Sequence, residues 1–412
     1  MSDSRFPHTY SAVLVELAQR LEEAPPGRVQ IVIGPRQVGK THLLRTLEER
    51  HPDRTILAAG DSAAAALSGW WEAQWREAEA LAKKRRRALL IVDEIQHLPD
   101  WNRRLKAEFD RVVRLGVPLH VVVSGSSSLL LGQGSRESMA GRFEVLRLLH
   151  WPPSELARHF KITAERAVEV TVTQGSYPGT VALLGQTERL CAYVRDAIIE
   201  PAIGRDIMAL EPVRKPGLLR QLFAIAAGHP AEIVSLKKLR GQLSDAGALE
   251  TIAHYLHVLE RAYLVAGVEK VTSSTVRRRA APPKLAVLNQ GIVTALADLP
   301  ARRTRPEPTV WGRWIENACI ALAWNAGQRV WYWRQEPHEV DLVTSGSWGE
   351  WAVEVKTGRV SALDLAGLLA FTARRRSFRP LLVCESGQER SATTVGISAI
   401  TWQQFLLNGP PV

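Results

Sequence analysis

The eight residues from Gly34 to Thr41 read Gly-Pro-Arg-Gln-Val-Gly-Lys-Thr, and they decide the fold of the first third of the chain. An apolar stretch, 29–33, precedes them and predicts a buried strand, while residues 42–50 predict a helix. A G-x-x-x-x-G-K-[ST] loop in this context directs backbone N–H groups and a helix N-terminus at a phosphate. The sequence therefore predicts a nucleotide-binding loop made of Gly34, Pro35, Arg36, Gln37, Val38, Gly39, Lys40, Thr41 and His42.

The second half of the expected site lies at the end of another buried strand. Residues 87–95 read Arg-Ala-Leu-Leu-Ile-Val-Asp-Glu-Ile, so that the strand ends in Asp93 and Glu94. We expect Lys40 to reach the β- and γ-phosphates, and Thr41 and Asp93 to hold Mg²⁺. Glu94 is placed to polarise the attacking water as a general base. ATP and Mg²⁺ are thus the predicted ligands, with ATP hydrolysis as the reaction.

The alternation of strands and helices predicts an α/β fold with a parallel sheet. A helix over 101–109 with three apolar residues on one face is followed by a strand over 119–123. Such alternation places helices on both faces of the sheet and the ligand at the carboxyl ends of the strands. Ser124 follows the second of these elements, where its hydroxyl could sense the γ-phosphate beside Glu94. The alternative is a Ser/Gly-rich turn without such a role.

Two arginines are candidates for an arginine finger. Arg142 follows a glycine and could act in its own chain or on a neighbouring subunit, and Arg136 is the second candidate. A surface arginine without this role is the alternative reading of Arg142. A finger supplied by a neighbour implies self-association into a ring, for which we expect a hexamer.

The composition suggests a polyanionic partner. The chain has 412 residues, with 53 Lys and Arg against 42 Asp and Glu, which gives a net charge of +11. Basic residues also occur in runs, at 83–87, 277–279, 302–303 and 374–376. Lysine and arginine in such numbers favour contact with phosphate backbones, although an isolated run is usually a solvated face. We therefore expect DNA as a partner.

Other sequence features bear on the compartment. Cys191, Cys319 and Cys384 are scattered singly without a C-x-x-C pair, so we expect neither disulfides nor a structural zinc site. No apolar run reaches the roughly 18–20 residues of a membrane span, and the start of the chain carries no early apolar segment. These features predict a cytoplasmic protein with no membrane partner.

By its motifs, the chain resembles the prokaryotic AAA+-type P-loop ATPases. Within them it is similar to a large family whose ATPase domain precedes a C-terminal region long called a domain of unknown function. The resemblance implies ATP hydrolysis by residues 1–152 and a helical lid and linker over 153–230. In related proteins the sensing polar residue is often Asn, from which Ser124 departs. The motifs that carry the resemblance are GPRQVGKT (34–41), LLIVDEIQ (89–96), VSGSSSLLL (123–131), AGRFEVLRL (140–148), EVDLV (339–343) and VEVKTG (353–358).

Residues 231–300 resemble a winged helix-turn-helix. The pattern predicts helices over 236–243 and 249–260 and then a β-hairpin, whose tip at 272–275 is flanked by the arginines at 277–279. In the second helix, Glu250, Thr251, His254 and His257 should face solvent, while Ile252, Leu256 and Leu259 pack inward. Such a fold either enters the major groove of DNA or docks another protein, and both readings stay open.

Residues 301–412 resemble the PD-(D/E)XK nuclease core. Asp341 lies on one expected strand, and Glu354 and Lys356 on its hairpin partner, with Glu316 as a possible fourth member. Paired carboxylates can hold Mg²⁺, and the lysine can orient the attacking water, so this is a candidate second Mg²⁺ site. Val340 stands where the pattern has proline. Many proteins with this fold have lost cleavage and serve as scaffolds, so nuclease activity stays open.

Three functions follow as alternatives. The first is an AAA+ machine that hydrolyses ATP and acts on DNA, for example by remodelling or migrating branched DNA in repair or recombination. The second is an ATP-dependent regulatory switch with a protein-docking winged helix. The third is a metal-dependent nuclease gated by ATP.

Overall fold

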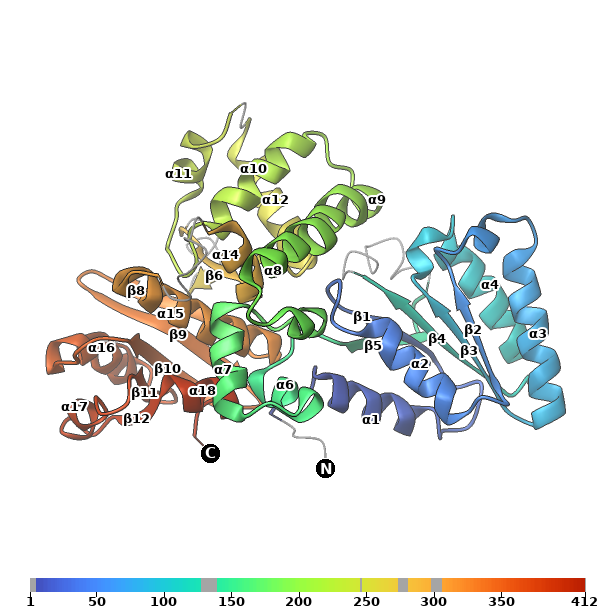
Figure 1. Ribbon diagram of the computed structural model, residues 1–412, viewed down its shortest axis with the longest axis horizontal. Coiled ribbons are helices and arrows are strands. Elements are labelled where there is room, and N and C mark those ends of the chain that lie inside the picture. The colour runs from blue at the N-terminus through green and yellow to red at the C-terminus, as the bar shows by residue number, and fades with distance from the viewer. Residues whose placement is uncertain (1–4, 127–138, 245–246, 273–280, 298–305, 412) are drawn as a thin grey trace.

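The computed structural model describes residues 5–126, 139–244, 247–272, 281–297 and 306–411 (Figure 1). Three sets of residues with predicted roles lie outside this range: Arg136, most of the expected hairpin tip with the flanking arginines (273–280), and the basic run at 302–303. Among the described residues, none of the helices combines the length and apolar composition needed to cross a bilayer. Cys319 and Cys384 are buried thiols, and Cys191 is a half-buried one.

The amino-terminal unit is a parallel sheet with helices on both faces, as the sequence predicts (Figure 1). Within the described residues its strand order is β2-β3-β4-β1-β5, and every pairing is parallel. The strands are β1 (Val29–Ile33), β2 (Thr55–Ala59), β3 (Ala88–Asp93), β4 (Leu119–Gly125) and β5 (Phe143–Arg147). The helices are α1 (Tyr10–Arg20), α2 (Lys40–Arg50), α3 (Trp70–Arg85) and α4 (Trp101–Arg114), with short 3₁₀ turns η1 (Ala63–Ala66) and η2 (Ile95–His97).

Continuous apolar sequence explains the burial of the central strands. Every residue of β1, β3 and β4 is buried, which is typical of parallel strands covered on both faces. Helices α3 and α4 pack on one face, where Trp101, Leu105 and Phe109 meet the sheet as expected. Helices α1 and α2 pack on the other face. The carboxyl ends of β1, β3 and β4 therefore meet at one edge of the sheet.

A helical segment connects this unit to the rest of the chain. It begins at Trp151-Pro152-Pro153, where two prolines end the α/β pattern and the second opens a helix. Figure 1 shows α6 and α7 between the two halves of the molecule. The helices are α6 (Pro153–Phe160), α7 (Ala164–Thr173), α8 (Thr187–Tyr193), the π-helical η5 (Val194–Ile199) and η6 (Ala202–Ile207), α9 (Met208–Leu210) and α10 (Pro216–Ala227), with the 3₁₀ turn η4 (Pro178–Leu183).

The next segment has the order predicted for a winged helix. Helices α11 (Leu236–Gly241) and α12 (Leu249–Arg261) are followed by the antiparallel strands β6 (Val265–Lys270) and β7 (Lys284–Val287), and then by α14 (Gln290–Leu296). On α12 the expected inward residues Ile252, Leu256 and Leu259 are buried, while His254 and His257 are exposed. The two faces of α12 are therefore as predicted.

The C-terminal unit is built on a sheet that extends beyond it. Its strand order is β12-β11-β10-β9-β8-β6-β7, and β6 pairs in parallel with β8 through Glu269 and Lys270. The sheet thus takes strands from both sides of the expected boundary at residue 300. Its elements are α15 (Pro308–Asn325), β8 (Arg329–Gln335), β9 (His338–Gly346), β10 (Gly349–Lys356), η7 (Ala362–Leu365), α16 (Ala366–Arg374), β11 (Arg379–Cys384), α17 (Arg390–Thr393), β12 (Ser398–Thr401) and α18 (Trp402–Asn408).

One hydrophobic cluster joins the helical segment, the winged-helix-like segment and the C-terminal unit. It extends from Phe6 to Leu406 and includes residues of α10, α12, α14 and α15. The N-terminal segment adds to this cluster, since Trp348 Nε1 donates to Arg5 O at 2.9 Å and Phe6 packs against the Trp348 ring. The parts that follow the ATPase-like unit therefore share one core.

Candidate nucleotide-binding site

The backbone of the loop between β1 and α2 has the close turns that its glycines allow. A Cβ at Gly34 would lie 1.9 Å from the carbonyl oxygen of Leu148, whose N–H donates to Ile33 O at 2.9 Å. Gly39 has φ +96° and is the N-cap of α2, and Gln37 also has positive φ. Left-handed residues of this kind turn successive N–H groups inward to form an anion-binding hollow. The loop geometry therefore fits a phosphate.

Lys40 begins α2 and is buried beneath the loop. Its Nζ donates to Gly34 O at 3.0 Å and to Pro35 O at 2.8 Å, and the residue is 5% exposed. Burial lowers the pKa of Lys40, and the nearby acids Glu94 and Asp93 only partly oppose this. Carbonyl oxygens offer partial charge alone, so the ammonium is in an environment that an added anion would stabilise.

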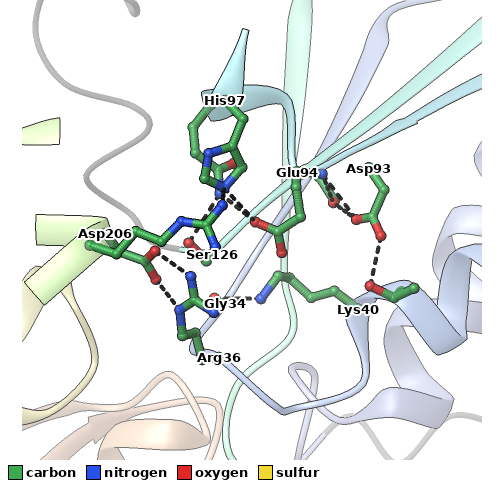
Figure 2. A network of polar contacts seen from close by, with 12 residues as sticks. Gly34, Arg36, Lys40, Asp93, Glu94, His97, Ser126 and Asp206 are labelled. Atoms are coloured by element: carbon green, nitrogen blue, oxygen red, sulfur yellow. Dashed lines mark hydrogen bonds and ion pairs between the residues drawn. The ribbon is translucent and has the colours of Figure 1, made fainter. Parts of the chain in front are cut away.

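Asp93 at the end of β3 connects the two halves of the site (Figure 2). Thr41 Oγ1 donates to Asp93 Oδ2 at 2.6 Å, and the Ser124 hydroxyl donates to Asp93 Oδ1. The backbone N–H of Glu94 donates to Ser124 Oγ at 3.1 Å. A hydroxyl next to a carboxylate suits a hard cation, so Thr41 and Asp93 are the residues that would hold Mg²⁺ with the nucleotide. Ser124 is buried and positions both acids.

Glu94 follows the strand in a left-handed conformation, with φ +51°. Such a φ is uncommon for a residue other than glycine and often marks a functional site. Its carboxylate accepts from Gln96 and lies 4.0 Å from His97 Nε2, and Gln96 also donates to Ser126 Oγ at 3.2 Å. The side chain is 22% exposed. Glu94 is therefore held in place and is still accessible to water.

Arg36 in the loop binds a residue of the helical segment. Its Nε and Nη2 each donate at 2.6 Å to the carboxylate of Asp206 on η6, a residue that is 4% exposed. Burial alone would lower the pKa of Arg36, but the hydrogen bond and charge of Asp206 raise it overall. Figure 2 shows Arg36, Lys40 and Glu94 within the same network of polar contacts. Arg36 is a loop residue as predicted, but its pairing with Asp206 was not predicted from the sequence.

Other residues support the loop from outside. Trp151 Nε1 donates to Val38 O at 2.9 Å. His42 is exposed on α2 and stacks on Tyr10 of α1, with ring centroids 5.6 Å apart. The loop is therefore braced by α1 and by the first residue after the α/β unit.

Arg142 lies beside the amino-terminal end of β1, whereas the loop follows the carboxyl end of the same strand. Its carbonyl accepts from Val29 N at 2.9 Å at the start of β1, and its guanidinium binds both oxygens of Asp110 at 2.6 and 3.1 Å. The five residues of β1, at about 3.3 Å each, separate it from the loop. This placement speaks against a finger role within its own chain, whereas a role toward a neighbouring subunit stays a prediction.

The second predicted cluster does come together in the C-terminal unit. Val355 N donates to Asp341 Oδ2 at 2.9 Å, and Lys356 Nζ donates to Glu354 Oε1 at 2.6 Å. Glu316 of α15 joins them through Lys284 of β7, whose Nζ lies 2.6 Å from Glu316 Oε1. Burial raises the pKa of Glu316 to about 8, with the Asp341 charge as the second cause. Burial also raises the pKa of Glu354.

Lys284 is a member of this cluster that the sequence analysis missed. Burial alone would lower its pKa, but Glu316, Asp341 and Glu339 raise it overall. The signal that could have identified Lys284 is a lysine at the first position of a strand that is buried throughout.

Comparisons with protein families cover two parts of the chain. Residues 26–157 match the model of a family described as an AAA domain, and residues 165–303 match a domain of unknown function. Together with the parallel order β2-β3-β4-β1-β5, the first match identifies the amino-terminal unit as a P-loop AAA+ ATPase fold. A second α/β unit forms the C-terminal part of the chain.

Similar whole chains are also known. Uncharacterised proteins of Mycobacterium tuberculosis (Rv2008c) and Mycobacterium bovis (Mb2031c) are each 24% identical over 399 residues, which are 95% of this chain and 83% of theirs. Among solved structures, RuvB of Thermotoga maritima, described as a Holliday junction branch migration motor, is 17% identical, with 65% of this chain and 94% of that chain covered and a TM-score of 0.33. AMPPCP-bound DnaA from Aquifex aeolicus is 15% identical, with 62% and 91% covered and a TM-score of 0.33. At such TM-scores neither structure carries an argument about function.

Proposed function

We propose that the protein binds Mg²⁺ with ATP and hydrolyses the phosphoanhydride bond between the β- and γ-phosphates, which gives ADP and phosphate. The observation that carries this proposal is the meeting of Lys40, Thr41, Asp93 and Glu94 at the carboxyl edge of the parallel sheet, braced by Ser124. These five side chains supply a phosphate-binding cation, a ligand pair for a divalent ion and a water-accessible carboxylate. Their chemistry is that of phosphoryl transfer to water.

Each residue has a separate part in the proposed reaction. The loop N–H groups and Lys40 orient the phosphates and offset their charge, while Thr41 and Asp93 hold the cation that neutralises the leaving group. Glu94 orients the attacking water and accepts its proton. Ser124 keeps Asp93 and the Glu94 backbone in register through its two hydrogen bonds.

The Arg36–Asp206 pair provides a route from the nucleotide to the helical segment. Arg36 sits in the phosphate-binding loop, and Asp206 sits 170 residues later on η6. A phosphate near Arg36 would compete with Asp206 for the same guanidinium, because a carboxylate and a phosphate each offer two oxygens that can accept from the guanidinium fork. Binding and release of the γ-phosphate would then move η6 relative to the loop, as a helical lid does.

We further propose that the protein uses this movement to act on DNA. We also propose that its active form is a ring, for which we expect six subunits. The net charge of +11 supports a polyanionic partner. In the described residues, the basic runs at 83–86 and 374–376 are exposed. The alternative, an ATP-dependent switch with a protein-docking winged helix, is supported by the same Arg36–Asp206 contact and by the exposed polar face of α12.

An ATPase assay with DNA separates these proposals. The full chain is assayed alone and with duplex, single-stranded and branched DNA, and Glu94→Gln serves as the variant that should slow hydrolysis by about 10²–10⁴ while nucleotide binding persists. Glu72→Gln, an exposed glutamate of α3 paired with Arg104, is the matched control and should keep full activity. Stimulation by DNA supports the DNA machine, whereas equal rates in all conditions favour the switch. Wild-type turnover by Glu94→Gln would exclude Glu94 as the base.

The ring has its own test. Arg142→Ala should slow hydrolysis without weakening nucleotide binding, and light scattering should show an oligomer when ATP is present. Full activity from a monomeric particle contradicts both the ring and the finger role of Arg142.

A further inference from the structure

The carboxylates of the C-terminal unit surround the ammonium of Lys284. This residue opens β7, in the segment before the C-terminal unit, and is 1% exposed. Its Nζ lies 2.6 Å from Glu316 Oε1, 3.2 Å from Glu339 Oε1 and 3.5 Å from Asp341 Oδ1. It also lies 3.2 Å from the backbone oxygen of Asp341. Three carboxylates from two different elements, α15 and β9, therefore converge on one ammonium.

These contacts can occupy all the hydrogen-bond donors of the Lys284 ammonium. An ammonium has three N–H donors, and four oxygens lie within 3.5 Å of this one. The space between Glu316 and Asp341, where their carboxylates could share a cation, is thus filled by Nζ.

The remaining carboxylate oxygens do not form a second cation site. Asp341 Oδ2 accepts from Val355 N at 2.9 Å, and Glu354 Oε1 accepts from Lys356 Nζ at 2.6 Å. Glu354 Oε2 is a buried carboxylate oxygen that accepts no hydrogen bond from the described residues. Mg²⁺ is usually held by one or two carboxylates together with several waters, and an oxygen buried in this way has no accessible surface at which those waters could complete the octahedron. In the described parts of the chain, no group of three or more His, Cys, Asp or Glu is arranged to hold a metal ion.

The donors present therefore do not fit the Mg²⁺ that a nuclease-like centre implies. An ion bound to Glu316 and Asp341 would share their oxygens with the buried ammonium of Lys284, which has charge of the same sign. Either Lys284 or the divalent ion can occupy this position, and the chain itself supplies Lys284.

We propose that Lys284 is a built-in counter-ion that replaces the divalent metal of the nuclease-like centre. The cluster then fastens β7 to α15 and β9 and does not cleave phosphodiesters. Lys284 begins the second strand of the hairpin, so the cluster also attaches the winged-helix-like segment to the C-terminal unit. The C-terminal unit is accordingly a scaffold for that segment.

Titration with MnCl₂ tests the proposal on the nucleotide-free full chain. The wild type and Asp341→Asn should bind Mn²⁺ identically, because Asp341 is not available to a metal. Lys284→Ala should gain one Mn²⁺ per chain, with at least tenfold tighter binding than any weak site of the wild type, and Lys284→Ala/Asp341→Asn should lose it again. Isothermal titration calorimetry gives the stoichiometry of all four proteins.

Two results overturn the proposal. One is a wild-type Mn²⁺ site that Asp341→Asn removes; this comparison stands even when Lys284→Ala fails to fold. The other is a folded Lys284→Ala that gains no site. Incubation of supercoiled DNA with the wild type and MnCl₂ is a second readout: intact DNA supports the proposal, and nicking that Asp341→Asn abolishes overturns it.

Discussion

Two buried lysines, Lys40 and Lys284, have opposite surroundings. Lys40 is 5% exposed and donates to the carbonyl oxygens of Gly34 and Pro35. Lys284 is 1% exposed and lies among three carboxylates. Burial lowers the pKa of Lys40, whereas Glu316, Asp341 and Glu339 outweigh burial and raise the pKa of Lys284.

The difference separates a binding group from a structural one. A buried cation without a full counter-charge is destabilising by itself, but an incoming polyphosphate can recover that free energy as affinity. A buried cation that is already surrounded by carboxylates has nothing further to bind, and its removal leaves uncompensated acids. We therefore propose different tasks for two lysines that are similarly buried.

The largest expected effect is on stability, from loss of the Lys284 charge. Lys284→Ala should lower the free energy of unfolding by about 3–5 kcal/mol, as breaking a buried ion pair does. Lys356→Ala is the matched control, because Lys356 forms an ion pair with Glu354 alone among the described residues and its side chain is 33% exposed, so its loss should be smaller. Urea unfolding of the three proteins at neutral pH measures the difference. Equal stability of Lys284→Ala and wild type would remove the structural role from Lys284.

The next effect is on nucleotide affinity, from loss of the Lys40 charge. Lys40→Ala should weaken ATP binding by about a hundredfold or more, since a hydrogen bond to a charged group contributes about 1.5–3 kcal/mol and Lys40 is expected to make more than one. Its free energy of unfolding should stay the same or rise, because a poorly compensated buried charge is removed. Lys83→Ala, exposed on α3 of the same unit, is the control. A strongly destabilised Lys40→Ala would place Lys40 in the same class as Lys284.

The parts of the candidate nucleotide site that are formed by short continuous stretches of sequence could be predicted. The loop motif fixes its own backbone between β1 and α2, and Asp93 and Glu94 end a strand whose apolar run is visible in the sequence. Since β1, β3 and β4 are parallel neighbours, the ends of these strands meet, and this brought Ser124 to Asp93 as the α/β pattern suggested.

The contacts that were missed join distant segments without a local signal. Arg36 and Asp206 are 170 residues apart, and the pairing depends on how η6 lies against the loop. Lys284 meets Asp341 across 57 residues because β6 joins β8 through a short parallel pairing. The same pairing places strands from both sides of residue 300 in one sheet, which helix and strand periodicity cannot predict.

A smaller effect should follow from the Arg36–Asp206 pair, where a half-buried cation forms an ion pair with one buried acid. Arg36→Ala should slow ATP hydrolysis by about tenfold, the scale of one charged hydrogen bond. Asp206→Asn should keep ATP affinity near the wild-type value but abolish any ATP-dependent change in the trypsin sensitivity of the helical segment. Arg220→Ala, on α10 and paired with Glu200, is the control. A wild-type tryptic response in Asp206→Asn would separate Asp206 from the movement of the lid.

The smallest expected effect concerns His150, a buried base with no acid beside it. Its Nδ1 accepts from Asn289 Nδ2 at 3.0 Å, and Nε2 lies 3.2 Å from Tyr263 O, an arrangement that requires the neutral ring. Burial lowers the pKa of His150 from 6.5 to about 4, and the Lys40 charge adds to this. His150 therefore resembles Lys40 in that burial outweighs the opposing interactions and disfavours the proton.

This pKa shift makes stability depend on pH in a known direction. Between about pH 6.5 and pH 4 the unfolded chain binds a proton at His150 that the folded chain does not, so stability is full above 6.5 and falls as the pH drops through this window. From pH 7 to 5.5 the loss due to His150 should be about 1 kcal/mol, since one pKa unit corresponds to about 1.4 kcal/mol. His150→Asn should reduce the pH slope of urea unfolding by that amount, even when its absolute stability is lower. His254→Asn, exposed on α12, should leave the slope unchanged. The slope of the free energy of unfolding against pH separates lost protonation from lost packing, which the urea midpoint at a single pH cannot do. An unaltered slope in His150→Asn would mean that burial does not disfavour a proton on His150. The contrast between Lys40 and Lys284 would then lose its physical basis.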